Sequence, residues 1–208
     1  MASLPLPRGF RAHVTNIGVK DQTDDFTVVA ADGPCSAAAV FTQSSFAGAS
    51  VLLSRRNAAS GTARAMVVIS KNANVATGPQ GMADAEEVVA GVAEALGCAA
   101  DDVLIASTGV IGRRYPIDRI RAGLRGIPNP LPSTDALAVA RGIMTTDTVA
   151  KSASASAGAA TVVGVAERRL FCQSGAGISA SVDDGENRPR RPMNRRIGVL
   201  STVANPKR

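Results

Sequence analysis

Short apolar segments alternate with loops rich in glycine, proline and small polar residues along the first 166 residues. β-branched and small apolar residues predict strands in six of these segments, and "ADGPCS" between the first two favours a hairpin-like pair, because Asp-Gly-Pro supplies backbone angles that turns use. The predicted strands are Phe26–Ala30, Ala37–Phe41, Val51–Ser54, Ala65–Ser70, Val103–Ala106 and Ala160–Ala166.

Three other segments carry apolar residues at three- and four-residue spacing, which is typical of helices. One ends at Gly97, one has Pro116 in its first turn, and one begins near Ser133 or Thr134 as N-cap. Their apolar positions are Val88, Val89, Val92, Ala93 and Leu96, then Ile117, Ile120 and Leu124, then Leu137, Ala140 and Ile143. The pattern predicts an α/β fold of mixed α+β type, with layered sheets and helices.

The pattern changes after Ala166. Residues 167–208 mix charge, Gly and Pro without sustained periodicity, so we predict a folded domain over residues 1–166 and a mostly disordered tail over 167–208. The tail holds nine of the 23 Lys and Arg residues but four of the 17 Asp and Glu residues, and therefore +5 of the net charge of +6. The net positive charge of the chain thus comes almost entirely from the tail.

Composition narrows the classes of function. Aromatic residues make up 3% of the chain, with no Trp and one Tyr, so nucleic-acid binding by base stacking is not expected. No apolar run approaches the roughly 20 residues that span a bilayer, and the N-terminus lacks a secretory signal, which favours a cytoplasmic protein without a membrane partner. The cysteines Cys35, Cys98 and Cys172 are scattered and have no metal-ligand spacing. We expect no metal and no bound cofactor.

The strand at Val103–Ala106 ends in Ser107-Thr108-Gly109. A glycine at a strand end lets the backbone turn and direct an N–H outward, and a neighbouring hydroxyl adds a second donor. Such donors can hold the oxyanion of an acyl transfer, whereas the plainer interpretation is a strand end followed by a helix cap. A phosphate-binding loop is disfavoured, because the spacings of the Walker and dinucleotide motifs are absent.

Two further polar clusters follow predicted elements. In "SKNANVATG", Asn72 and Asn74 either build the loop or support the neighbouring strand end; in "IMTTDT", three threonines around Asp147 either bind a polar substrate or cap a helix. His13, the single histidine, has no nearby acidic or Cys partner in the sequence, so a Ser-His-Asp or Cys-His mechanism has little support. Together the clusters indicate electrostatic acyl-transfer chemistry with a hydroxyl nucleophile.

Four motifs in this order, "AAAVFTQSSFAGASVLLSR", "VVISKNANVATG", "LIASTGVIG" and "IMTTDTVAK", resemble the bifunctional ornithine acetyltransferase/N-acetylglutamate synthase family of arginine biosynthesis. The resemblance runs from about Arg8 to Ala166 and corresponds to the N-terminal, α-chain region of that family. The motifs look most like those of actinobacterial members of the family, some of which serve secondary metabolism.

The resemblance implies a cytoplasmic acyltransferase that moves an acetyl group from N-acetylornithine to glutamate, with acetyl-CoA as a second possible donor. It also implies a precursor that cuts itself into α and β chains, two of each per assembly. The new N-terminal Thr of the β chain forms the acetyl-enzyme. By position, the Thr108 hydroxyl and the Gly109 N–H match the oxyanion hole, and Thr145 matches a substrate-binding threonine.

The sequence departs from the family after Ala166. There the family has Lys-Gly-x-Gly, whose Lys binds substrate, and then Met-Ala-Thr, whose Thr is the nucleophile. Here Glu167 takes the place of that Lys, and no Thr lies between Thr161 and Thr202. We therefore expect a truncated α-like chain with no nucleophile, inactive or nearly so alone, whose tail is out-of-frame sequence. The alternative is a catalytically inactive α-like binding protein whose genuine basic tail docks an acidic partner.

Overall fold

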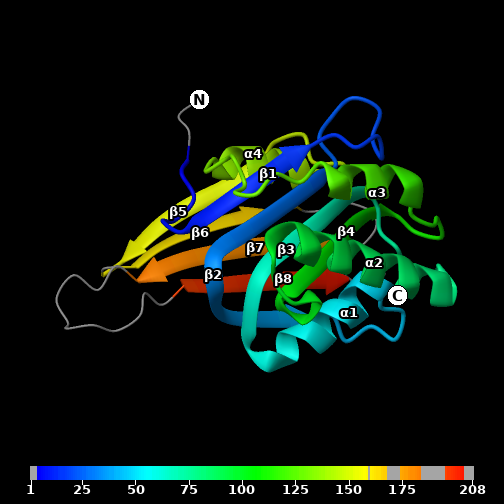
Figure 1. Ribbon diagram of the computed structural model, residues 1–208, viewed down its shortest axis with the longest axis horizontal. Helices are drawn as coiled ribbons and strands as arrows, with labels where there is room; N and C mark the ends of the chain where they lie inside the picture. Colours follow the sequence, from blue (N-terminus) through cyan, green and yellow to red (C-terminus); the bar gives the residue numbers. More distant parts are fainter. Residues whose placement is uncertain (1–3, 159, 168–173, 184–194, 204–208) are drawn as a thin grey trace.

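The computed structural model describes residues 4–158, 160–167, 174–183 and 195–203. Its eight strands form one mixed sheet in the order β4-β3-β2-β8-β7-β6-β5, with β1 paired to β2 (Figure 1). The strands are β1 (Phe10–Thr15), β2 (Phe26–Phe41), β3 (Thr62–Asn72), β4 (Val103–Val110), β5 (Lys151–Ala157), β6 (Ala160–Ala166), β7 (Ser174–Asp183) and β8 (Arg195–Val203). The helices are α1 (Ala49–Asn57), α2 (Gly78–Leu96), α3 (Ile117–Arg125) and α4 (Ala136–Ile143), with 3₁₀ turns η1 (Ala58–Ser60) and η2 (Ala100–Asp102).

Two hydrophobic cores lie on opposite faces of the strands β2, β3 and β4. Because successive strand residues point to opposite faces, Val67 and Ile69 of β3 pack toward α1, α2 and α3, while Met66 and Val68 pack toward α4 and β6. Helices α1, α2 and α3 gather at the right of Figure 1, and α4 lies beside β1. The predicted mixed α/β architecture is confirmed.

Several predicted elements are present where the pattern put them. The segments predicted as strands at Ala65–Ser70, Val103–Ala106 and Ala160–Ala166 lie within β3, β4 and β6. Helix α2 has a proline in its first turn and ends at Gly97, which adopts the left-handed conformation with a φ of 65°. Helix α4 begins one or two residues later than predicted, since Asp135 is the N-cap in place of Ser133 or Thr134, and its side chain accepts from the N–H of Leu137.

The segment Val51–Ser54, predicted as a strand, lies in helix α1 instead. The face of α1 that packs against the core includes buried polar residues, so the apolar residues alone do not show the three- and four-residue spacing of a helix. Ser54 Oγ donates to the Ile105 carbonyl at 2.6 Å, and Asn57 Nδ2 donates to the Val103 carbonyl at 2.9 Å. These bonds hold α1 against β4.

The predicted hairpin between Phe26–Ala30 and Ala37–Phe41 is also wrong, because both segments belong to the single strand β2. The Asp-Gly-Pro sequence falls where the register against β3 shifts, between Ala30 and Cys35, so it forms an irregularity within the strand instead of a turn. The first half of β2 pairs with β1, and the second half pairs with β8.

The tail contains two strands where the sequence predicted irregular chain. β7 and β8 pair with each other, and they join β6 to the second half of β2. Apolar residues occupy every second position of β7, where Ala176, Ile178, Ala180 and Val182 alternate with Gly and Ser, a pattern typical of strands. Apart from Glu167, the remaining tail positions lie outside the described residues, and the domain boundary at 166 stays a prediction.

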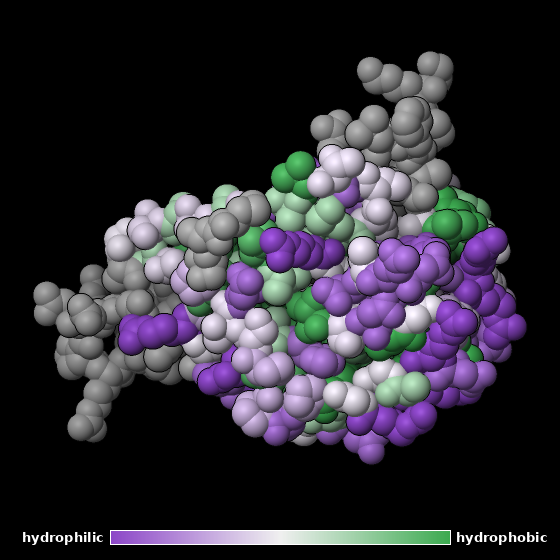
Figure 2. Space-filling model, turned by 90° about the horizontal axis from the view of Figure 1, so that it is seen from above, coloured by the Kyte–Doolittle hydropathy of each residue, from purple (hydrophilic) through white to green (hydrophobic). Residues whose placement is uncertain are grey.

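The described surface is mixed in polarity. Seen from above, charged and polar side chains cover much of one face, with smaller apolar areas between them (Figure 2). Within the described residues, none of the helices combines the length and the apolar character needed to cross a membrane.

Candidate active site

The parallel strands β3 and β4 end side by side and place two predicted clusters together. Ser70 is in register with Thr108, and Lys71 with Gly109. The carboxyl ends of parallel strands meet at one edge of a sheet, so both polar loops open at that edge. The register therefore joins "SKNANVATG" to "STGVIG" in one site.

The close approach of β3 and β4 at Lys71 and Gly109 requires a glycine at position 109. Its φ is 141°, and a Cβ added there would lie 2.0 Å from the carbonyl carbon of Lys71. No side chain fits that position without moving the backbone of β3. The glycine thus allows the two strand ends to approach while the chain turns.

The end of β3 and the loop after it adopt the left-handed conformation at three residues other than glycine: Lys71 (φ 80°), Asn74 (φ 49°) and Ala76 (φ 57°). The two asparagines stabilise the loop. Asn72 Nδ2 donates to the Arg114 carbonyl at 2.8 Å, and Asn74 Nδ2 donates to the Gly81 carbonyl at 2.8 Å. Both amides therefore build the loop, and Asn72 also ties it to the segment after β4.

Thr108 and Thr145 meet at the same carboxylate. Thr108 Oγ1 donates to Glu167 Oε2 at 2.9 Å, and Thr145 Oγ1 donates to Glu167 Oε1. Thr108 is fully buried, Glu167 is 3% exposed, and Thr145 follows helix α4. The structure thus brings two of the predicted site residues together through Glu167, the residue at which the sequence departs from the family motif.

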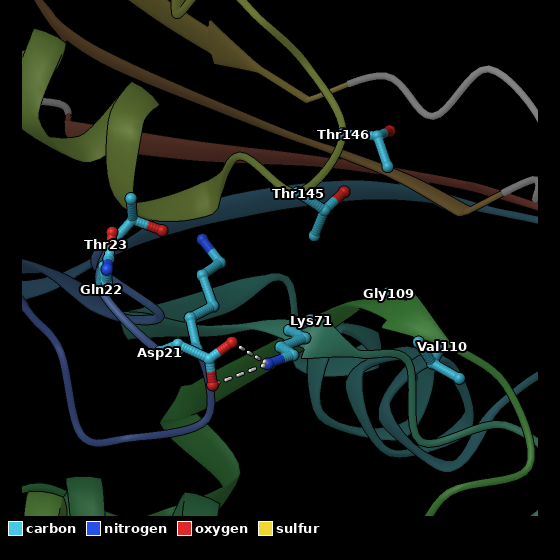
Figure 3. A pocket seen from close by; sticks show the side chains of 9 residues that line it. Asp21, Gln22, Thr23, Lys71, Gly109, Val110, Thr145 and Thr146 are labelled. Carbon is cyan, nitrogen blue, oxygen red and sulfur yellow. Dashed lines mark hydrogen bonds and ion pairs between the residues drawn. The ribbon is translucent and has the colours of Figure 1, made fainter.

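A pocket of about 460 Å³ opens beside these groups (Figure 3). Thr145 and Thr146 lie on one side of it, and Lys71 with its ion-pair partner Asp21, at 3.4 Å, lies on the other. The lining residues are Lys20, Asp21, Gln22, Thr23, Lys71, Gly109, Val110, Thr145 and Thr146. Gly109 and Thr145 therefore share one pocket with two lysines.

Sequence reasoning missed Lys20. Its ammonium donates to the carbonyls of Asp24 and Met144, both at 2.5 Å, and so bridges the loop before β2 and the end of α4. Burial lowers the pKa of Lys20, against raising contributions from Asp25, Asp24 and Glu167. The only signal in the sequence was a lysine in the acidic stretch "KDQTDD", which by itself is typical of a solvated loop.

A second hydroxyl cluster lies beside this site and includes Ser107. Ser50 Oγ lies 2.6 Å from Ser107 Oγ and 3.2 Å from Tyr115 Oη, and Ser107 also bonds Tyr115. Burial raises the pKa of Tyr115, partly offset by these bonds. Ser107 thus anchors the end of β4 to α1, while the next residue, Thr108, bonds Glu167.

Among the described residues, His13, Cys35 and Cys98 do not line the pocket. His13 pairs with Val28 in the sheet, and burial lowers its pKa. The Cys35 thiol is buried and donates to the Ala63 carbonyl, Cys98 is half-buried, and Cys172 lies outside the described residues. Among the His, Cys, Asp and Glu residues that the structure describes, no group of three or more is placed to hold a metal ion.

The fold is similar to that of two solved structures. The crystal structure of ornithine acetyltransferase complexed with ornithine from Mycobacterium tuberculosis matches with a TM-score of 0.68 and 30% identity, over 79% of this chain and 91% of that one. The crystal structure of the arginine biosynthesis bifunctional protein ArgJ from Bacillus halodurans matches with a TM-score of 0.65 and 27% identity, over 93% and 86%.

The chain belongs to the ArgJ family, whose model matches residues 11–168. Arginine biosynthesis bifunctional protein ArgJ 2 of Nostoc sp. is 53% identical over 161 residues, which are 77% of this chain and 42% of that protein. Glutamate N-acetyltransferase Oat2 of Streptomyces clavuligerus is 49% identical over 162 residues, 77% of this chain and 41% of that protein. The chain spans about two fifths of the length of these curated relatives, and β7 and β8 lie outside the family match.

Proposed function

We propose that this chain provides the α-chain part of a glutamate N-acetyltransferase that transfers an acetyl group from N-acetylornithine to glutamate. The observation that carries the proposal is the convergence of Gly109 and Thr145 on one pocket in a chain of the ArgJ family. The names of the relatives, and the ornithine bound in one solved structure, support this choice of substrates.

In the proposed reaction a nucleophilic threonine attacks the acetyl carbonyl, and negative charge develops on the carbonyl oxygen. The Thr108 hydroxyl and the Gly109 N–H stabilise this oxyanion, while Thr145 binds the substrate. Removing such a donor typically lowers kcat by about 10²-fold or more. The Thr108 hydroxyl, which donates to Glu167, has to turn toward the substrate to act in this way.

The nucleophile of the proposed reaction comes from a β chain, in an assembly of two α and two β chains. The sequence contains no Thr between Thr161 and Thr202, so we expect the 208-residue chain alone to transfer little acetyl. Acetyl-CoA is a possible second donor, no other cofactor is invoked, and a cytoplasmic location follows from the biosynthetic role.

Two-dimensional NMR of the full chain tests the proposed substrate pocket. Titration with N-acetylornithine or glutamate is expected to shift the backbone amides of Gly109 and Thr145 saturably, and Thr145→Val is expected to raise the Kd by about tenfold, the effect of one hydrogen bond to a charged group. Ala47 and Met82, which line a different hollow, serve as internal controls. The proposal would be contradicted if the amides of Ala47 and Met82 shifted as much as those of Gly109 and Thr145. It would also be contradicted if Gly109 and Thr145 did not shift at millimolar ligand.

A further inference from the structure

Glu167 is a buried carboxylate held by hydroxyls from two distant elements. It follows strand β6 directly, whereas Thr108 is on β4 and Thr145 follows α4, 59 and 22 residues away along the chain. Only 3% of Glu167 is exposed. A carboxylate removed from water is stable only when donors replace its hydration, so these contacts are required by the burial of Glu167.

The two hydroxyls divide the carboxylate between them. Thr108 donates to Oε2 at 2.9 Å, and Thr145 donates to Oε1. An ionised carboxylate accepts hydrogen bonds and donates none, so both hydroxyls act as donors toward a single anion. A site that binds the carboxylate of a small molecule would use the same arrangement.

We propose that Thr108 and Thr145 form a carboxylate-binding site that this chain fills with its own Glu167, and that accepts a short monocarboxylate such as acetate once the Glu167 side chain is removed. The inference rests on the proposed function in one respect, namely that Thr145 faces the substrate pocket. It goes beyond that function because it assigns the anion that the threonine pair binds and identifies Glu167 as an internal competitor for external ligands.

The surroundings of the threonine pair favour an anion. Glu167 accepts from Thr145, and Thr145 lines the pocket together with Lys20 and Lys71. The charge of Glu167 acts on Lys20, where it opposes the lowering of the pKa by burial. A bound carboxylate would restore this charge, whereas a cation would face Lys20 without compensation.

Glu167→Ala provides a matched test, because it removes a CH2–COO⁻ group that acetate replaces almost atom for atom. Sodium acetate, compared with sodium chloride at equal ionic strength, is expected to raise the Tm of Glu167→Ala by about 3 °C at concentrations well above the Kd. The wild type and Glu94→Ala, which alters an exposed glutamate on α2, should show no such difference. Adding Thr108→Val to Glu167→Ala should abolish the shift.

An acetate effect of the same size in wild type, Glu94→Ala and Glu167→Ala would overturn the proposal, as would an effect that survives Thr108→Val. If Glu167→Ala is unfolded in chloride, dilution from urea into acetate or chloride gives the same comparison by circular dichroism. Refolding of Glu167→Ala in acetate but not in chloride supports the carboxylate site. Equal refolding in the two salts, or no refolding in either, overturns it. Turnover is not measured, so failure here is distinct from failure of substrate binding in the NMR experiment.

Discussion

Lys71 holds an unusual position for a lysine, at the end of β3 and in the wall of the pocket. Its φ of 80° lies in the left-handed region, which residues with a Cβ adopt at a cost of about 1–2 kcal/mol. Its ammonium pairs with the exposed Asp21 at 3.4 Å, and an ion pair of this kind contributes little to stability. The backbone strain at Lys71 is thus larger than the gain from its visible contact.

We predict that Lys71→Gly is more stable than Lys71→Ala by about 1 kcal/mol in the free energy of unfolding measured by urea denaturation. Both variants remove the ion pair with Asp21, so their difference isolates the backbone conformation. Equal stabilities, or a more stable Lys71→Ala, would show that the left-handed conformation at this position carries no strain.

At the residue scale, sequence reasoning proposed Thr108, Gly109 and Thr145 as site residues but could not predict what they contact. Their types and their places at element ends were visible in the sequence. The contact of both hydroxyls with Glu167 was not, because it depends on where β6 ends relative to β4 and α4. Lys20 was missed for the same reason, since its two carbonyl partners lie on separate segments.

At the element scale, the sheet depends on the two strands of the tail. β8 pairs with the second half of β2, and β7 pairs with β6, so these strands connect the β5–β6 pair to the rest of the sheet. Without them, two long strand edges lose their hydrogen-bonding partners. The tail therefore has a structural role that its composition did not suggest.

We predict that a chain of residues 1–167, which lacks β7 and β8, has a Tm several degrees below that of the full chain. Each lost kcal/mol lowers the Tm of a chain of this size by about 2–4 °C. Thermal unfolding followed by circular dichroism provides the measurement, and a chain ending at Val203, which keeps both strands, is the control. Equal melting temperatures for residues 1–167 and the full chain would show that β7 and β8 contribute nothing to stability.

The errors at this scale share one cause. Helix α1 buries Ser54 and Asn57 through hydrogen bonds to β4, and β2 runs through an Asp-Gly-Pro sequence that favours a turn. In both cases partners across the fold override the local preference. Segments with strong apolar periodicity, such as α2 and β3, were predicted correctly because their local pattern and their burial agree.

At the scale of the whole molecule, the chain contains one side of the proposed active site. Gly109 and Thr145 line the pocket, Thr108 is buried next to Gly109 in the sequence, and the proposed nucleophile belongs to a β chain. Acetyl transfer should therefore require a second polypeptide.

We predict that the pure 208-residue chain gives no acetyl transfer from N-acetylornithine to glutamate above background, and that adding the β chain of a family member gives turnover. In that mixture Thr108→Ala should lower kcat by about 10²-fold or more through loss of an oxyanion donor. A coupled assay of ornithine release measures both rates, with Glu94→Ala, a change at an exposed position of α2 outside the pocket, as the control. Turnover by the chain alone that survives Thr108→Ala would refute the assignment.

The sequence by itself determined the mixed α/β class, the family and the placement of hydroxyls and glycine at element ends, because local periodicity and motif order are properties of neighbouring residues. Only the tertiary structure decided that β2 is continuous, that α1 is a helix, that β7 and β8 complete the sheet, and that Glu167 joins Thr108 to Thr145. Those features depend on hydrogen bonds between segments far apart in the chain, whose pairing and register are fixed only when the sheet and its two cores assemble.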